Sequence, residues 1–526
     1  GIECRGGDDI GQDVDCQRHV VLQHAGMIGG RFRRCRGVDF AADILDLLGD
    51  LDDKVALPGY DRAKVRPGVV HLGVGAFHRA HQAAIFDAAL RSGDLRWGIV
   101  GVSLRSAGVR DQLAPQDGLY TLVVREGDEQ QLRIIGAVAD MLVAPEDPAA
   151  VVAALADADT HLVTLTVTEK GYKLDPSSGN LRRDDHDVAA DLASLDAPRT
   201  APGFIVAALA KRRAAGLLPF TAISCDNLPH NGGRLKQAVL TMARAHDATL
   251  ADWIEANGAF PQTMVDRIVP ATTDEDIAAL AATLGVEDRG MVKTEPFCQW
   301  VIEDHFAGER PDFAALGVQL TKAVPPWEDA KLRLLNGAHS GLAYLGGLAG
   351  IDFVDQMVAR DDARHFVETL SDEAQTTLSP PPGLDIASYR KALMARFANS
   401  ALQHRTRQIA VDGSQKLPQR LLAPIAARRE AGASSPVLCL AVAAWIRWQG
   451  GVDDSGARYT VDDPLADRTA SALAGCGSTE ERVDALLTID SIFPQALAAD
   501  SGFRADVTQW LNILENEGAL AALSRV

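Results

Sequence analysis

Four residues suited to acid–base chemistry or to holding a substrate oxygen lie close together in the segment 325–339. Two prolines begin this segment, and prolines favour the first turn of a helix. At about 100° per residue, Lys331, Asn336 and His339 fall within about 140° of one another on an α-helix, and Glu328 lies inside the same arc. A buried lysine near the positive end of a helix has a lowered pKa, which lets it act as a general acid or base. By itself, such a polar face is more often a solvated helix surface.

A strand, a glycine turn and a helix follow one another in residues 69–81, Val-Val-His-Leu-Gly-Val-Gly-Ala-Phe-His-Arg-Ala-His. Gly73 permits the tight turn, and Gly75 lets the backbone approach a pyrophosphate at the start of the helix. His78 holds the place of the usual third glycine, so the motif alone is weak evidence for a dinucleotide site. The next strand ends near Arg105 without an acid for a ribose hydroxyl, which leaves NADP open beside NAD.

Buried-strand patterns alternate with helical patterns up to about residue 322, which predicts an α/β fold with a doubly wound sheet of the Rossmann type. The expected strands cover 69–72, 97–102, 161–167, 220–224 and 264–269, with helices over 149–156 and 203–213. Helical patterns then dominate, over 331–348, 362–378, 389–398, 435–448 and 507–523. We expect a poorly ordered extension over 1–56, a Rossmann-type domain over 57–322 and a mostly α-helical domain over 323–526.

The composition narrows the class of partner. The net charge of −19, from 71 acidic and 52 basic residues, disfavours nucleic acid and anionic membranes. No apolar run is long enough for a transmembrane helix, and the first residues do not resemble a secretory signal. The seven cysteines include no Cys-x-x-Cys pair, which favours free thiols in a cytoplasmic protein. His78 and His81 have a spacing found in metal sites but no accompanying third ligand, so we expect no metal.

Seven blocks of sequence carry a more specific signal. They read Gly-Val-Gly-Ala-Phe-His-Arg-Ala-His (73–81), Thr-Val-Thr-Glu-Lys-Gly-Tyr (166–172), Ser-Cys-Asp-Asn (224–227), Met-Val-Asp-Arg-Ile-Val-Pro (264–270), Glu-Pro-Phe-Cys-Gln-Trp-Val-Ile-Glu-Asp (295–304), Lys-Leu-Arg-Leu-Leu-Asn-Gly-Ala-His-Ser (331–340) and Asp-Gly-Ser-Gln-Lys-Leu-Pro-Gln-Arg (412–420). In this order they resemble the polyol-specific long-chain dehydrogenases, the mannitol dehydrogenase family. That family includes mannitol 2-dehydrogenase and fructuronate reductase (D-mannonate oxidoreductase). The resemblance extends from about residue 57 to the C-terminus.

The resemblance implies hydride transfer with NAD and without a metal. Lys331 would be the general acid and base, and Asn227 and Asn336 would polarise the substrate carbonyl. His339 would orient the substrate, and Glu328 would relay protons to the lysine. The residues expected to bind the cofactor are Val70, Leu72, Gly73, Gly75, Ala76, Phe77, His78, Arg79, Thr168 and Glu169.

The resemblance also bears on the substrate. Residues 168–172 read Thr-Glu-Lys-Gly-Tyr, as in the uronate branch, whereas the polyol branch reads Thr-Glu-Gly-Gly-Tyr. A uronate carries a carboxylate that needs a cation, which favours Lys170 as the discriminating residue. The residues expected to bind the substrate are Lys170, Asp266, Arg405 and Lys416, with Arg407 as a further candidate.

We therefore expect a reversible reduction of D-fructuronate to D-mannonate, with fructose and mannitol as the alternative pair. Two other classes remain at this stage, a nicotinamide-binding regulator without catalysis and a lysine-dependent dehydrogenase of branched or phosphorylated hydroxy acids. The sequence leaves the oligomeric state open, either a monomer or a small homo-oligomer.

Overall fold

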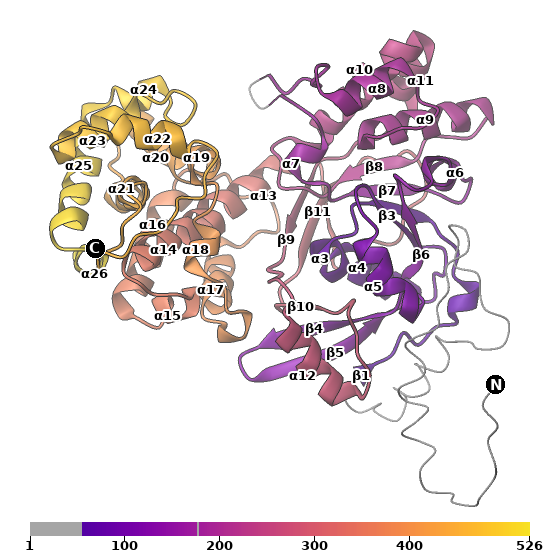
Figure 1. Cartoon of the computed structure of the whole chain (residues 1–526), viewed down its shortest axis with the longest axis horizontal. Coiled ribbons are helices and arrows are strands. Elements are labelled where there is room, and N and C mark those ends of the chain that lie inside the picture. The colour runs from indigo at the N-terminus through magenta and orange to yellow at the C-terminus, as the bar shows by residue number, and fades with distance from the viewer. Residues whose placement is uncertain (1–54, 176–177) are drawn as a thin grey trace, which may run out of the picture.

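The computed structural model describes residues 55–175 and 178–526, which form two lobes (Figure 1). The first lobe is α/β, and the second is built from helices that begin with α13 (Pro325–Ala330). The extension expected over 1–56 falls almost wholly on residues 1–54, which lie outside the described residues. Its last two residues form strand β1 (Val55–Ala56), which pairs with β5 (Glu129–Ile135), so the first lobe begins at or before Val55.

A five-stranded parallel sheet forms the centre of the first lobe. Its order is β6 (Val138–Val143), β3 (Ile99–Ser103), β2 (Val69–Leu72), β7 (Leu162–Leu165) and β8 (Thr221–Ser224). Strands β2, β3, β7 and β8 are buried along their whole length, as apolar strands covered on both faces must be. The order changes direction beside β2, which is the switch point at which such sheets bind ligands. The predicted Rossmann-type fold is confirmed.

Helices cover both faces of this sheet (Figure 1). One face packs against α6, α9, α10 and α11, and the other packs against α4 and the aromatic side chains of Trp300 and Phe313. The helices of this lobe are α3 (Ala76–Ala80), α4 (Gln82–Arg91), α5 (Gly108–Leu113), α6 (Pro148–Ala156), α7 (Thr168–Gly171), α8 (His186–Ala193), α9 (Ala201–Ala214), α10 (Asn231–His246), α11 (Ala248–Asn257) and α12 (Asp274–Leu284). The one helix expected after the glycine turn is two, because the chain bends at His81 between α3 and α4.

Two smaller sheets extend the lobe, and the sequence did not predict them. One has the order β1, β5, β4 (Tyr120–Glu126) and β10 (Val292–Thr294), and the other has the order β12 (Gln319–Thr321), β11 (Gln299–Glu303) and β9 (Thr263–Asp266). The strand expected over 264–269 is β9, but it runs antiparallel to β11 and lies outside the parallel sheet. A short apolar run predicts a strand but not the strand with which it pairs. The sequence therefore could not show that β9 lies outside the parallel sheet.

The second lobe encloses its own hydrophobic core. Helices α14 (Gly337–Leu348) and α21 (Pro436–Trp448) contribute many of its fully buried residues. The remaining helices of this lobe are α15 (Val354–Val358), α16 (Asp361–Gln375), α17 (Ile386–Phe397), α18 (Thr406–Ile409), α19 (Gly413–Leu417), α20 (Ala423–Glu430), α22 (Ala466–Leu473), α23 (Thr479–Leu487), α24 (Gln495–Ala498), α25 (Ser501–Asn516) and α26 (Ala519–Leu523). The helix expected over 507–523 is two, α25 and α26, separated by Gly518 at φ 87°. Among the described helices, none combines the length and the apolar character needed to cross a bilayer.

Candidate active site

The glycine turn has the geometry that a dinucleotide requires. Gly73 follows β2 at φ 96°, and a Cβ there would collide with the carbonyl oxygen of Thr166 on the neighbouring strand connection. Gly75 precedes α3 and is exposed, and a Cβ built on it would meet no atom within 4 Å. No side chain caps the start of α3, so its first N–H groups face that open space. These residues fit the pyrophosphate of a dinucleotide.

The residues predicted to bind the cofactor separate into two groups. Gly73, Gly75, Ala76, Phe77, Thr168 and Glu169 keep accessible surface beside the turn. Val70, Leu72 and His78 are fully buried, so their side chains support the turn, and contact of these residues with a cofactor stays a prediction. The ring of His78 stacks on His71 with the centroids 3.3 Å apart, and burial lowers the pKa of both imidazoles, which keeps them neutral.

The guanidinium of Arg79 is likewise directed into the protein. It donates to the carbonyl oxygen of Gly290 at 2.6 Å and more weakly to that of Gly75 at 3.4 Å. The Tyr120 hydroxyl in turn donates to the Arg79 carbonyl oxygen at 2.7 Å. Arg79 therefore connects the glycine turn to the sheet that contains β4 and β10, and its guanidinium points away from the open space at the turn.

Asp226, a carboxylate that was not predicted from the sequence, positions the backbone that follows β7 beside the glycine turn. Asp226, next to Asn227 after β8, accepts hydrogen bonds from the backbone N–H groups of Val167 and Thr168 at 3.0 and 2.9 Å. The Tyr172 hydroxyl also donates to Asp226, at 2.7 Å. Thr168 has φ 63°, which is unusual for a β-branched residue and is held by these bonds. The sequence feature that could have indicated Asp226 is its position inside the block 224–227.

Lys331 is the centre of the site. It is 6% exposed, and its ammonium group donates to Asn227 Oδ1 at 2.7 Å and to the Val265 carbonyl oxygen at 2.6 Å. Desolvation lowers its pKa, and the nearby carboxylate of Asp266 partly opposes this effect. A buried amine whose pKa falls toward neutrality can both give and take a proton at cellular pH.

The backbone around Lys331 departs from the expected α-helix. Residues Lys331–Asn336 form a π-helical segment, η3, between α13 and α14. Such segments are rare and occur often at functional sites. The angular argument made for a regular α-helix is therefore wrong in detail. Burial is the largest cause of the lowered pKa of Lys331.

The other three predicted catalytic residues surround the same segment. Burial raises the pKa of Glu328 to about 7, so this carboxyl can exchange protons near neutral pH. Burial and the neighbouring His404 lower the pKa of His339, which keeps that imidazole neutral, and its Nε2 makes no hydrogen bond within the described residues. Asn336, at the end of η3, is only partly buried, so its amide remains accessible.

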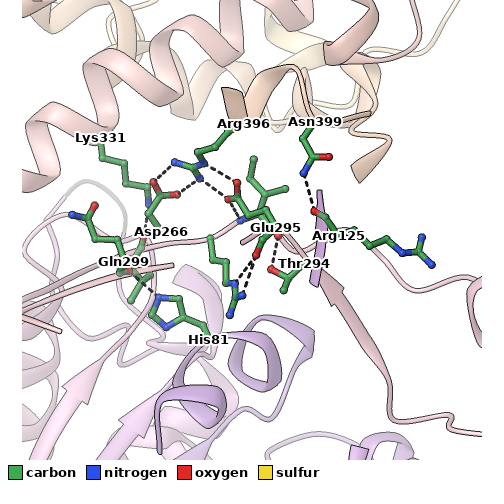
Figure 2. Close-up of polar contacts among 12 residues, drawn as sticks. His81, Arg125, Asp266, Thr294, Glu295, Gln299, Lys331, Arg396 and Asn399 are labelled. Carbon is green, nitrogen blue, oxygen red and sulfur yellow. Dashed lines mark hydrogen bonds and ion pairs between the residues drawn. The ribbon is translucent and has the colours of Figure 1, made fainter. Parts of the chain in front are cut away.

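A buried ion-pair network joins the two lobes next to Lys331 (Figure 2). Arg396 of α17 makes a two-pronged contact with Asp266 at 2.8 and 2.9 Å and with Glu295 at 2.8 and 2.7 Å. Asp266, at the end of β9, thus has both oxygens bound to Arg396 while it also acts on Lys331 through space. We had expected Asp266 to support or contact the substrate, and its supporting role is the one visible in these contacts. Arg396 and Glu295 were not predicted, although Glu295 begins one of the seven blocks.

The cations predicted to bind a substrate carboxylate lie in different settings. Lys416 of α19 is partly buried, and its pKa of about 8 is lowered by burial and by Arg420, while Glu169 of α7 in the other lobe opposes the shift. Lys170 is exposed on α7, and α7 lies on the side of the first lobe that faces the helical lobe (Figure 1). Arg405 is exposed and stacks on the Phe353 ring, and Arg407 pairs with Asp453 at 3.2 Å. The described contacts of Arg405 and Arg407 are thus with other residues of the helical lobe, so we no longer expect them to bind substrate.

The fold and this lysine-centred site define an oxidoreductase of the dinucleotide-binding type. The chain belongs to the mannitol dehydrogenase family: residues 67–315 match the mannitol dehydrogenase Rossmann domain, and residues 323–515 match the mannitol dehydrogenase C-terminal domain.

Similar proteins include both named activities of this family. D-mannonate oxidoreductase of Escherichia coli is 43% identical over 88% of this chain and 96% of its own length. Mannitol 2-dehydrogenase of Pyrenophora tritici-repentis is 42% identical over 90% of this chain and 84% of its own. The structure of Pseudomonas fluorescens mannitol 2-dehydrogenase, a ternary complex with NAD and D-mannitol, superposes with a TM-score of 0.80 at 38% identity, covering 90% of this chain and 96% of that one.

Proposed function

We propose that this protein catalyses the reversible, NAD-dependent reduction of D-fructuronate to D-mannonate. The observation that carries the proposal is the buried ammonium group of Lys331, which donates to Asn227 Oδ1 at 2.7 Å. Asn227 belongs to the same lobe as the glycine turn. This arrangement supplies a proton donor for an alkoxide and an amide for the carbonyl oxygen at one place.

NAD, when bound, supplies or accepts the hydride. The residues at the turn 73–77 fit its pyrophosphate, and the similar Pseudomonas fluorescens enzyme was solved with NAD. Arg105 is exposed beyond the end of β3, where the 2′-phosphate of NADP would need a cation. The activity with NADPH should therefore be compared with the activity with NADH.

The chain's own residues account for the proton. In reduction, Lys331 holds a proton at Nζ beside the substrate oxygen and gives it up as charge develops there. Because Asn227 Oδ1 accepts from the lysine, its amide N–H groups stay available for the same substrate oxygen, and Asn336 supplies a second amide. Glu328, with a pKa of about 7, then restores the lysine proton from solvent.

Charge favours the uronate over a neutral ketose. Lys416 and Arg420 lie close enough to each other for their charges to interact, and Arg420 also acts on Lys331. Carboxylates also act on Lys416, whereas Arg420 has no carboxylate partner among the described residues, so its guanidinium suits an anionic substrate. The mannitol 2-dehydrogenases at about 40% identity make fructose and mannitol the second candidate pair.

Parallel assays of NADH oxidation with D-fructuronate, D-tagaturonate and D-fructose test the proposal, with NADPH in place of NADH as a further arm. We expect D-fructuronate to give the highest kcat/KM. A wide margin for D-fructose would replace the proposal by the polyol reaction. Cofactor binding without turnover of any of the three would instead support a regulator.

A further inference from the structure

Two π-helical segments pack against each other beside the active site. The first is η3, which carries Lys331, and the second is η5 (Pro418–Leu422), which carries Arg420. At the contact, Gly337 allows close approach, since a Cβ there would lie 3.0 Å from the carbonyl oxygen of Arg420. π-helical segments are rare and tend to occur at functional sites. A catalytic role for Lys331 accounts for η3 but not for η5, so η5 should have a function of its own.

Arg420 differs from Arg396 and Arg333, the two paired arginines near the site, in having no acidic partner among the described residues. Its Nη1 donates to Ser340 Oγ at 3.1 Å, and no carboxylate pairs with it within residues 55–175 and 178–526. By contrast, Arg396 pairs with Asp266 and Glu295, and Arg333 pairs with Asp329. A guanidinium carries five N–H donors, so most of those of Arg420 are unused by the chain.

Partial burial adds a cost to this lack of a partner. Desolvation lowers the pKa of Arg420 to about 10, so the group is still charged at neutral pH. Charged groups taken partly out of water are normally paired, and no carboxylate of the described residues supplies a counter-charge to Arg420. An anion that binds here would satisfy both the charge and the free donors.

The position of Arg420 relates it to the reacting centre. Its charge contributes to lowering the pKa of Lys331, of His339 and of Lys416, so it lies near all three. Lys416, one turn earlier, donates to the backbone carbonyl oxygens of Ile409 and Val411, which leaves it fewer donors than Arg420. The planar guanidinium can also make two parallel hydrogen bonds to a carboxylate, which an ammonium cannot.

We propose that Arg420 binds the carboxylate of a sugar-acid substrate and thereby selects uronates over neutral ketoses. This inference rests on the proposed function, because it assigns the acid group of that substrate to one residue of the same site. In a uronate the carboxylate and the reacting carbonyl are separated by a few carbon–carbon bonds, which matches a binding group adjacent to Lys331 and His339.

The test measures binding in a complex that cannot turn over. D-Mannonate and D-mannitol are titrated separately into the full-length protein saturated with NADH, and heat is recorded by calorimetry. The variants are Arg420→Gln and Arg420→Lys, and Arg407→Gln is the matched control, because Arg407 is exposed and paired with Asp453. Unchanged NADH binding shows that each variant is folded.

We expect Arg420→Gln to weaken D-mannonate binding on the order of 100-fold and D-mannitol binding by less than about 3-fold. Arg420→Lys should fall between wild type and Arg420→Gln, since it keeps the charge and loses the paired hydrogen bonds. Equal weakening for both ligands, or none for D-mannonate, would overturn the inference. If Arg420→Gln does not fold, the selective loss with Arg420→Lys decides the question by the same criterion.

The two proposals fail in different ways. If D-fructuronate is not reduced but D-mannonate binds in an Arg420-dependent manner, the reaction is wrong and the carboxylate site stands. If D-fructuronate is reduced equally well by wild type and Arg420→Gln, the reaction stands and the carboxylate site is wrong. A wild-type protein that binds no sugar acid overturns both.

Discussion

Lys331 Nζ and Asn227 Oδ1 lie 2.7 Å apart, although the residues are separated by 104 positions and belong to different lobes. The bond connects the start of η3 to the loop that follows β8. It orients the Asn227 amide and fixes the lysine beside the nucleotide-binding lobe, so the contact between the two lobes assembles the candidate reacting centre.

Removal of the amine should abolish most of the chemistry without unfolding the protein. We expect Lys331→Ala to lower kcat for ketone reduction by about 10² to 10⁴-fold, the usual size of a general-acid contribution. Single-turnover NADH oxidation measures the chemical step directly. Lys322→Ala, at an exposed lysine nearby in sequence, should leave the rate unchanged. Retention of most of the rate by Lys331→Ala would rule out the lysine mechanism.

A carboxylate placed next to the lysine should move the pH dependence of alcohol oxidation. Asn227→Asp puts a negative charge about 2.7 Å from the ammonium group, which raises the pKa of Lys331. In oxidation the lysine must be unprotonated to accept a proton, so the rising limb of kcat/KM against pH should shift upward by about one unit or more. Asn257→Asp, at an exposed position, serves as the control. A limb that stays in place would show that another group titrates there.

The pKa of Glu328 predicts an effect on stability with a definite sign. Burial raises this pKa from 4.5 to about 7, so the unfolded chain loses the proton at lower pH than the folded chain does. Below pH 4.5 the group is protonated in both states and costs nothing, and between pH 4.5 and 7 the stability of the folded protein falls as pH rises. Glu328→Gln removes this loss.

Urea unfolding at pH 5 and pH 8 measures the effect. We expect Glu328→Gln to exceed wild type by about 1–3 kcal/mol at pH 8 and by much less at pH 5. Glu430→Gln, at an exposed glutamate, should differ from wild type by the same small amount at both values. A Glu328→Gln variant that is less stable than wild type at pH 8 would contradict the prediction.

The ion-pair network of Arg396 should contribute to the joining of the lobes. Arg396→Met leaves Asp266 and Glu295 without a cation in a buried setting, which typically costs about 3–5 kcal/mol. Thermal unfolding of this variant should begin at a clearly lower temperature than that of wild type. Arg407→Gln removes an exposed cation and leaves Asp453 its hydrogen bonds from Ser455 and Ala457, so it should cost at most about 1 kcal/mol. Equal behaviour of the two variants would show that the buried network adds nothing to stability.

The two glycines of the turn should respond differently to alanine. Gly73→Ala forces a side chain into a φ of 96° and against the Thr166 carbonyl, so we expect a loss of folding stability. Gly75→Ala adds a methyl group to open space, so stability should be kept while the Kd for NADH rises by about 10-fold or more, because the added group lies where the pyrophosphate approaches. Fluorescence titration of NADH and urea unfolding separate the two effects. Unaltered NADH binding by Gly75→Ala would place the pyrophosphate elsewhere.

The sequence by itself determined the parts of this protein that local pattern encodes. Buried β-branched runs predicted the strands at 69–72 and 221–224. The glycines at 73 and 75 predicted the turn that follows the first of these strands and leads to the nucleotide site. The block 331–340 contained the lysine, amide and imidazole that the structure brings together around η3. These features depend on neighbours within a few residues, which periodicity and turn chemistry report directly.

Only the tertiary structure decided which charges lack a partner. Arg396 and Arg420 both lie in helical segments. Arg396 is bound to Asp266 and Glu295 of the other lobe, whereas the guanidinium of Arg420 bonds only to Ser340 among the described residues. The same holds for His78, which occupies a cofactor motif in sequence and is buried against His71 in space. Burial and pairing arise from contacts between segments far apart in the chain, and the free energy of a charge depends on those contacts rather than on its sequence neighbours.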